Sequence, residues 1–247
     1  MPEIAVWGWA LLVLGAVIIG VSKTALPGAG TVAVAIFAAV LPPKQSTGTI
    51  LLLLILADLF AITAYRRHVN WKALLRLAPA VVVGLAIGIW FLAVATDELV
   101  GRVIGVLLLA VVAFTLARRW MRRGTEDSGP HVVAATGYGV LGGFTTMVAN
   151  AAGPVMSMYF LAARFPVKEF LGTAAWFFFL VNISKVPFSI GLGLITAPGL
   201  LVDLVLAPVV VAATFLGRWI ANRLDQAVFE RIVIALTLVG AAYLILA

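Results

Sequence analysis

The chain has 247 residues, of which 64% are hydrophobic and 11% charged, and its mean hydropathy is +1.16. A soluble core of this length could not bury that much apolar surface, so the composition indicates an all-α protein that crosses the membrane several times. The net charge of +7 does not point to nucleic acid, because the basic residues cluster at the ends of apolar stretches, where they meet membrane lipid.

The first apolar segment is interrupted at membrane depth by the stretch VSKTALPGAGTV, residues 21–32. Pro27 removes a backbone donor and Gly28 permits dihedral angles closed to other residues, so a helix over 6–21 should stop there and a second should follow over 31–41. An arm of 11 residues covers about 16 Å, roughly half of the hydrocarbon core. We therefore expect a hairpin over 6–41 that enters the membrane and returns.

Six further apolar stretches are long enough to cross the membrane, and a second interrupted pair lies between them. The hydrophilic segment 118–130 divides the chain near its middle, and its residues 124–130 are expected to form a cytoplasmic linker. The first repeat, 1–123, has crossing helices over 48–65, 77–95 and 99–117. The second repeat, 131–247, has a hairpin over 131–163 with arms 131–147 and 154–163, followed by crossing helices over 170–190, 200–217 and 228–246.

The two halves match when the sequence is shifted by 124 residues. This shift places Gly48 on Gly172, Asp58 on Asn182, and the first break on residues 147–154 (MVANAAGP). Duplicated halves with short, interrupted segments at corresponding positions are typical of transporters and mark the substrate site. We expect the two repeats to form one integrated transmembrane domain.

The distribution of lysine and arginine favours an inverted relation between the repeats. If each hairpin returns to its starting side, only Lys44 and Arg102 lie outside the cell. Thirteen basic residues then lie on the cytoplasmic side, as the preference for basic cytoplasmic loops requires: Arg66, Arg67, Lys72, Arg76, Arg118, Arg119, Arg122, Arg123, Arg164, Lys168, Arg218, Arg223 and Arg231. A parallel relation would divide these residues almost evenly.

Three charged residues far from the loops are of interest. Lys23 lies in the first break, Lys185 lies sixteen residues into the crossing segment 170–190, and Asp58 is the single acid inside such a segment of the first repeat. Each is a candidate for function, because charge at this depth is costly without a partner. For Lys185 the alternative is snorkelling, and for Asp58 the roles considered are counter-ion, proton carrier or structural pair.

The two breaks together predict a site for a small oxyanion. Helices that begin near Gly30 and Gly153 would aim their N-terminal backbone N–H groups at the middle of the membrane, a geometry that favours an anion. The predicted substrate-binding residues are Ser22, Lys23, Thr24, Gly28, Ala29, Gly30, Thr31, Thr145, Thr146, Asn150, Gly153, Pro154, Asn182 and Lys185. For any one of the hydroxyl and amide groups, the alternative is that it only satisfies backbone opened by the break.

Neither catalysis nor a cofactor is expected. The chain has no cysteine, and its two histidines, His68 and His131, lie beside basic loops outside the apolar segments. They supply neither a metal site nor the histidine of an intramembrane protease. The chain is therefore not expected to be an enzyme.

Three stretches resemble the sulfite exporter TauE/SafE family: GVSKTALPGAG at residues 20–30, LPPKQSTG at 41–48, and ADLFA with YRRHVNWK within 57–72. This resemblance implies a bacterial inner-membrane permease built from two similar halves that moves sulfite, thiosulfate, an organosulfonate or a related anion. A passive anion channel and a non-transporting subunit or sensor are the alternatives. The direction of flux, the coupling ion and the formation of a homo-oligomer are left open.

Overall fold

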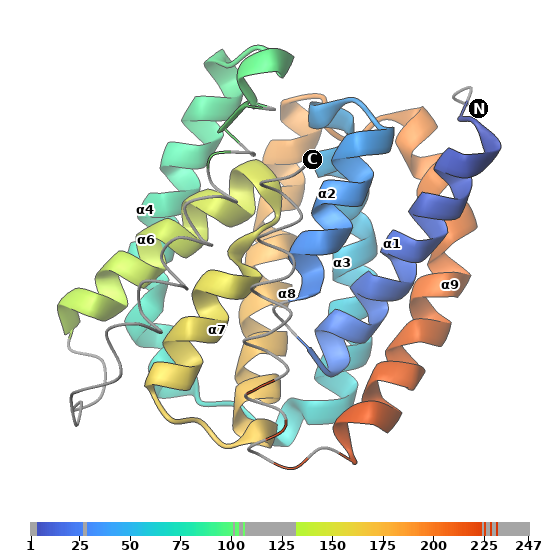
Figure 1. Ribbon diagram of the computed structural model, residues 1–247. Coiled ribbons are helices and arrows are strands. Elements are labelled where there is room, and N and C mark those ends of the chain that lie inside the picture. Colours follow the sequence, from blue (N-terminus) through green and yellow to red (C-terminus); the bar gives the residue numbers. More distant parts are fainter. Residues whose placement is uncertain are drawn as a thin grey trace.

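All regular elements in the described part of the chain are helices (Figure 1). The computed structural model describes residues 4–26, 29–100 and 132–223, together with residues 102, 103, 106, 225, 228 and 231. Its elements are α1 (Val6–Thr24), α2 (Gly30–Val40), α3 (Pro43–Tyr65), the short 3-10 helix η2 (Arg66–His68), α4 (Trp71–Val94), α6 (Val132–Ala149), α7 (Ala152–Ala162), α8 (Val167–Gly191) and α9 (Ala197–Ala221). The linker 124–130 and most of the predicted helices over 99–117 and 228–246 lie outside the described residues.

The lengths of these helices confirm an all-α membrane protein. Five segments in the described ranges are long and apolar enough to cross a bilayer: α1, α3 continued by η2, α4, α8 and α9. The helices α2 and α7 have 11 residues each, which gives about 16 Å. The helix α1 has 19 residues and spans about 28 Å, so by length it could cross the membrane.

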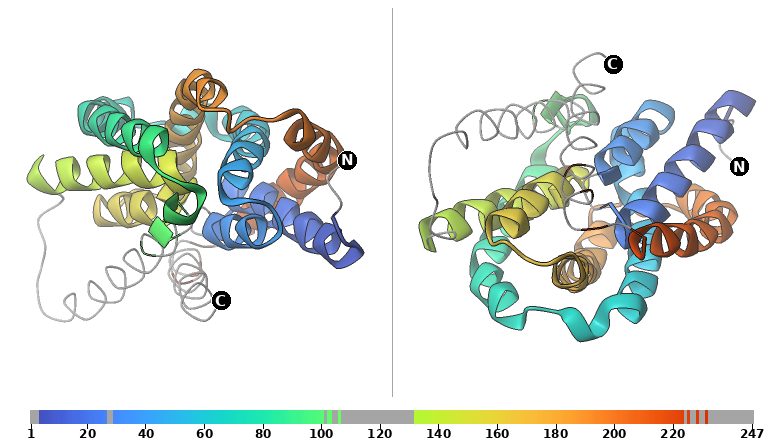
Figure 2. Two further views of the ribbon diagram at one scale, coloured as in Figure 1. Left: turned by 90° about the horizontal axis from the view of Figure 1, so that it is seen from above. Right: turned by 60° about the horizontal axis from the view of Figure 1, so that its bottom comes forward.

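Two groups of helices lie on either side of a central pair. On one side α4 packs against α6, which continues into α7, and on the other side α1 packs against α2 and α9. Between these groups, α3 and α8 pack against each other, as the view from above shows (Figure 2). Each group has its own apolar core, so the central pair lies at the junction of two packed units.

The two interrupted hairpins open toward opposite faces of the molecule. From its break, α2 runs back toward the upper side of Figure 1, whereas α7 runs from its break toward the lower side. Both short helices therefore start inside the molecule and end near a surface. Their N-termini, rather than their C-termini, lie in the interior.

Two glycines that the shift of 124 residues matches make similar contacts in the central pair. A Cβ added to Gly48 near the start of α3 would collide with the carbonyl group of Leu194, just beyond α8. A Cβ added to Gly172 near the start of α8 would lie 2.8 Å from the carbonyl oxygen of Tyr65, at the end of α3. Each helix thus begins with a glycine against the end of the other, as expected for antiparallel helices related by a two-fold axis in the membrane plane.

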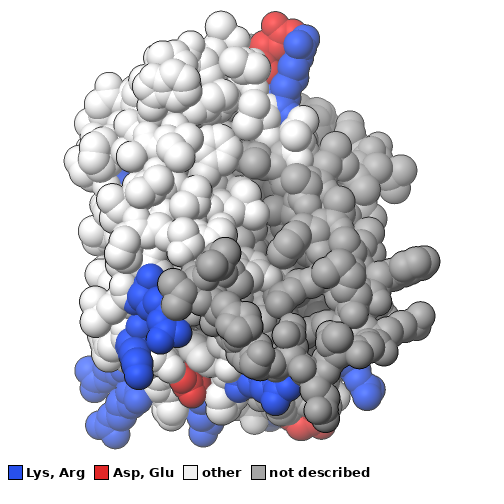
Figure 3. All heavy atoms as spheres, turned by 90° about the vertical axis from the view of Figure 1, so that its left-hand side faces the viewer, with Lys and Arg blue, Asp and Glu red and all other residues white. Residues whose placement is uncertain are grey.

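The basic loops gather on one face. The connection between α3 and α4, the connection between α7 and α8, and the C-terminal end of α9 all lie at the lower side of Figure 1. These segments hold basic residues of both halves, and blue spheres follow the lower edge of Figure 3. The inverted arrangement requires such a distribution. The inverted relation of the repeats and the cytoplasmic location of this face stay predictions.

Reporter fusions test this topology. A reporter joined after Arg223, at the end of α9, should give a cytoplasmic signal, and one joined at Asp97, after α4, should give a periplasmic signal, because the loop charges orient the protein. The measurement is paired phosphatase and fluorescent-protein activity in a bacterial host. If both fusions report the same compartment, the inverted arrangement is wrong.

Candidate functional site

The first break begins later than predicted. The predicted end of the first helix is near Val21, but α1 continues to Thr24. Lys23 therefore lies in the last helical turn of α1. The hydroxyl groups of this turn lie against carbonyl groups of their own helix: Ser22 donates to the carbonyl of Ile19 at 2.9 Å, and the Thr24 hydroxyl lies 3.0 Å from that of Gly20. A lysine in a last turn also interacts favourably with the helix dipole.

The second break turns at Asn150, which lies between α6 and α7. Its φ of 52° is in the left-handed region, which Asn tolerates better than most residues. Ala151 holds the N-cap position of α7, and no side chain caps this helix. Instead Asn150 Nδ2 donates to the carbonyl of Thr47 at 2.9 Å, which fixes the turn against α3.

The helix α3 satisfies backbone groups at both breaks. Near its end, the Tyr65 hydroxyl donates to the carbonyl of Thr24 at 2.9 Å, which the ending of α1 leaves open. Near its start, the Thr47 hydroxyl lies between two carbonyl groups, 3.1 Å from that of Pro43 on its own helix and 3.3 Å from that of Val148 in the last turn of α6. Because unsatisfied backbone groups are costly in an apolar interior, these two side chains stabilise both interruptions.

An ion pair joins the first break to α3. Nζ of Lys23 lies 2.8 Å from Oδ1 of Asp58, and it also lies 4.1 Å from the ring centroid of Phe178 on α8. The Asp58 side chain is wholly buried, and that of Lys23 is 9% exposed. Asn182 Nδ2 donates to the second carboxylate oxygen at 2.8 Å, so the two positions matched by the repeat are in direct contact.

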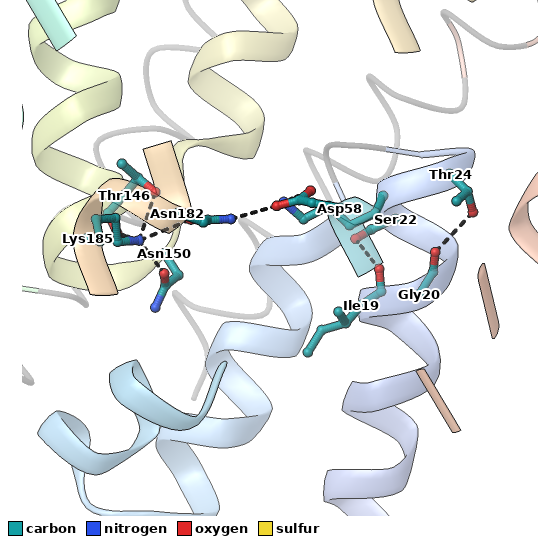
Figure 4. Close-up of polar contacts among 10 residues, drawn as sticks. Ile19, Gly20, Ser22, Thr24, Asp58, Thr146, Asn150, Asn182 and Lys185 are labelled. Carbon is teal, nitrogen blue, oxygen red and sulfur yellow. Dashed lines mark hydrogen bonds and ion pairs between the residues drawn. The ribbon is translucent and has the colours of Figure 1, made fainter. Parts of the chain in front are cut away.

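Lys185 does not snorkel, because it is only 1% exposed and its ammonium group lies among oxygen atoms in the interior. Nζ donates to Asn150 Oδ1 at 2.6 Å and to the carbonyl of Thr146 at 2.7 Å. It also lies 3.2 Å from Thr146 Oγ1 and 3.3 Å from Asn182 Oδ1. Figure 4 shows the resulting row of side chains from Lys185 through Asn182 to Asp58.

A small cavity of about 30 Å³ lies between the two breaks. This volume holds roughly two or three water molecules. Eight of the predicted substrate-binding residues line it, from both halves of the chain: Ser22, Lys23, Gly30, Thr31, Thr146, Asn150, Gly153 and Asn182. The starts of α2 and α7 thus reach one enclosed space.

The other predicted residues that the structure describes do not line this cavity. Thr24 donates to the carbonyl of Thr214 on α9 at 3.0 Å, and Thr145 bonds to carbonyl groups of its own helix. Ala29 and Pro154 are buried at the starts of their helices, and Lys185 lies behind Asn150 and Thr146. Gly28 lies outside the described residues.

Four apolar residues that were not predicted also line the cavity: Leu54, Ala174, Ala175 and Phe178. A signal for two of them was present, because Ala174 and Phe178 precede Asn182 by eight and four residues and so share its face of α8. Phe178 also places its ring against Lys23. It therefore contributes a cation–π contact in addition to apolar surface.

Comparison with known families gives one result that covers nearly the whole chain. A family model described as "Sulfite exporter TauE/SafE" matches residues 12–244. No curated protein and no solved structure matches. The matched range includes both breaks and every residue of the cavity wall.

Replacing Lys185 by methionine tests the buried network. Lys185→Met leaves the carbonyl of Thr146 and the amide oxygens of Asn150 and Asn182 without their donor, so we expect the folded state to lose about 3–5 kcal/mol of stability. Thermal melting of the purified protein in detergent measures this loss. Lys72→Met, at an exposed position, is the control and should melt as the wild type does. Equal melting of the two variants would show that the network adds no stability.

Proposed function

The chain belongs to the sulfite exporter TauE/SafE family, and on that premise we propose that it transports a small sulfur-containing oxyanion that binds in the cavity between the two breaks. The observation that carries the proposal is the position of Lys23, the one lysine or arginine among the described residues that line this cavity. An anion that leaves water needs several donors at once, and a charged donor contributes most.

Neutral hydrogen-bond donors at the second break and at the starts of α2 and α7 would bind the anion together with the ammonium group of Lys23. Gly30 and Gly153, at the starts of α2 and α7, line the cavity from opposite halves of the chain. The first N–H groups of a helix have no partner within that helix, and the dipole makes this end positive. Two helix N-termini therefore attract an anion without adding another mobile cation.

The two amides beside the cavity serve mainly to shape it. The side chain of Asn150 accepts from Lys185 and donates to Thr47, and that of Asn182 accepts from Lys185 and donates to Asp58. The oxygen and one N–H of each amide are thus used within the protein, which fixes the orientation of both side chains. We assign the direct contacts to Lys23, to the helix N-termini and to the hydroxyl groups of Ser22 and Thr146, which can rotate.

The size of the cavity favours a compact anion. A volume of about 30 Å³ holds only a few water-sized groups, so a compact anion fits this cavity better than a long organic chain does. Sulfite, thiosulfate and short sulfonates are therefore the first substrates to test. The longer sulfoacetate and taurine, together with sulfate, complete the set.

Removal of the cavity ammonium group tests the proposed site. We expect Lys23→Ala to weaken binding of thiosulfate or sulfite about 10- to 100-fold, as for one lost charge-assisted contact. The measurement is anion binding to purified protein in nanodiscs, with folding checked by thermal melting.

Two further variants make this test specific. Lys23→Ala combined with Asp58→Asn removes both charges of the ion pair, so that no unpaired carboxylate remains to disturb the fold. Lys168→Ala, at an exposed position of α8, should bind as the wild type does. Unchanged affinity in a folded Lys23→Ala protein would refute the placement of the anion.

Flux measurements separate the transporter from a passive channel and from a subunit that moves nothing. We expect uptake into proteoliposomes to saturate with substrate and to depend on an imposed proton gradient, because the buried carboxylate of Asp58 is available to carry a proton. A channel would follow only the electrochemical gradient of the anion. Absence of any flux by protein that binds the anion would favour a sensor.

A further inference from the structure

The buried cluster around the cavity carries an odd number of charges. Its connected contacts run from Lys23 through Asp58, Asn182 and Lys185 to Asn150, and three of these five residues are ionisable. With all three ionised, the two ammonium groups and one carboxylate give a net charge of one positive unit. Burial of uncompensated charge is costly, so the cluster favours one negative charge from a ligand.

The contacts of Lys185 favour the charged form of its side chain. Four oxygen atoms surround its Nζ within 3.3 Å, from Thr146, Asn150 and Asn182. A neutral amine has only two protons to donate and presents a lone pair, which would repel at least one of these acceptors. The surroundings of Lys185 therefore suit an ammonium ion.

Asp58 is the group whose charge depends on the ligand. Among the described residues, its carboxylate has two charged or polar contacts, the ammonium group of Lys23 and the amide of Asn182. An anion in the cavity competes for Lys23, which lines the cavity, whereas Asp58 lies behind it. A monovalent anion leaves the summed charge at zero while Asp58 stays ionised. A divalent anion adds one negative charge more and attracts Lys23 more strongly, so the carboxylate keeps only a neutral donor and gains from protonation.

Other charged groups on the elements packed against α3 lie outside this cluster. Lys168 is exposed at the start of α8 and Arg218 lies in the last turn of α9. The basic residues of η2 are exposed as well. Asp203 on α9 is buried, 8% exposed, and its carboxylate has no hydrogen-bond partner among the described residues.

We propose that the cavity binds a monovalent oxyanion without proton exchange, and that it binds a divalent oxyanion only together with one proton, which Asp58 takes up. In both complexes the buried charges sum to zero. The proton comes from solvent and adds to a carboxylate oxygen of Asp58, with no other bond made or broken. This inference rests on the proposed function, since it assumes an anion beside Lys23.

Two anions of similar shape and different charge test the proposal. Methanesulfonate carries one negative charge and thiosulfate two at neutral pH, and both present a sulfonyl group. Titration calorimetry in buffers of different ionisation enthalpy counts the protons taken up on binding. We expect about one proton for each thiosulfate and about none for methanesulfonate. Thiosulfate affinity should rise up to about tenfold for each unit by which the pH falls, and methanesulfonate affinity should stay constant.

Three variants assign the proton. Asp58→Asn should abolish the uptake and raise the preference for thiosulfate over methanesulfonate by about tenfold or more, because its cluster carries two positive charges. Asp58→Asn combined with Asn182→Asp returns a carboxylate to the cluster near Lys185 and should restore the uptake. Asp203→Asn, the matched control, changes a buried carboxylate outside the cluster and should keep the wild-type uptake.

The outcomes separate this inference from the proposed function. If both anions bind to the wild type with the same proton uptake, the inference is wrong and the anion site stands. If uptake disappears in Asp203→Asn and persists in Asp58→Asn, the proton goes elsewhere and the inference is wrong as well. If neither anion binds to folded wild-type protein, the proposed function fails and the inference fails with it.

Discussion

The ion pair between Lys23 and Asp58 sets the conditions that the surrounding helices must meet. Two opposite charges 2.8 Å apart in an apolar interior are stable only if their remaining hydrogen-bonding groups are also satisfied. Asn182 supplies the second contact of the carboxylate, and Phe178 faces the ammonium group. Both come from α8, so the pair can form only when α8 crosses α3 at this depth. The crossing is in turn close because Gly48 and Gly172 leave room at both ends of the helix pair.

The same crossing explains how two broken helices persist in a hydrophobic protein. Tyr65 and Thr47, from opposite ends of α3, bond to carbonyl groups that the two breaks leave open. Lys185 on α8 holds the second break through Thr146 and Asn150. The central helices therefore satisfy the broken backbone as well as the charges, which is the requirement for irregular structure at membrane depth.

The division of roles between the two lysines is suited to reversible binding. Lys185 is enclosed by oxygen atoms and stabilises the second break, whereas Lys23 has an exposed edge on the cavity. An anion thus meets one ammonium group, already partly neutralised by Asp58, and two helix N-termini. Two unpaired ammonium groups would hold an anion more tightly and slow its release, which would oppose transport.

Many structural features of this protein were predictable from its sequence. The apolar stretches predicted the membrane helices, because only long apolar helices hide their backbone from lipid, and Pro27 and Gly28 predicted the interruption before α2. The shift of 124 residues aligned Asp58 with Asn182 and so predicted that these residues hold equivalent positions in the two repeats. Only the tertiary structure decided that these two residues touch, that Lys185 is buried rather than snorkelling, and that Thr24 turns away toward α9. A pattern along one helix gives the depth and face of a side chain, whereas its partner depends on which helices cross and at what height.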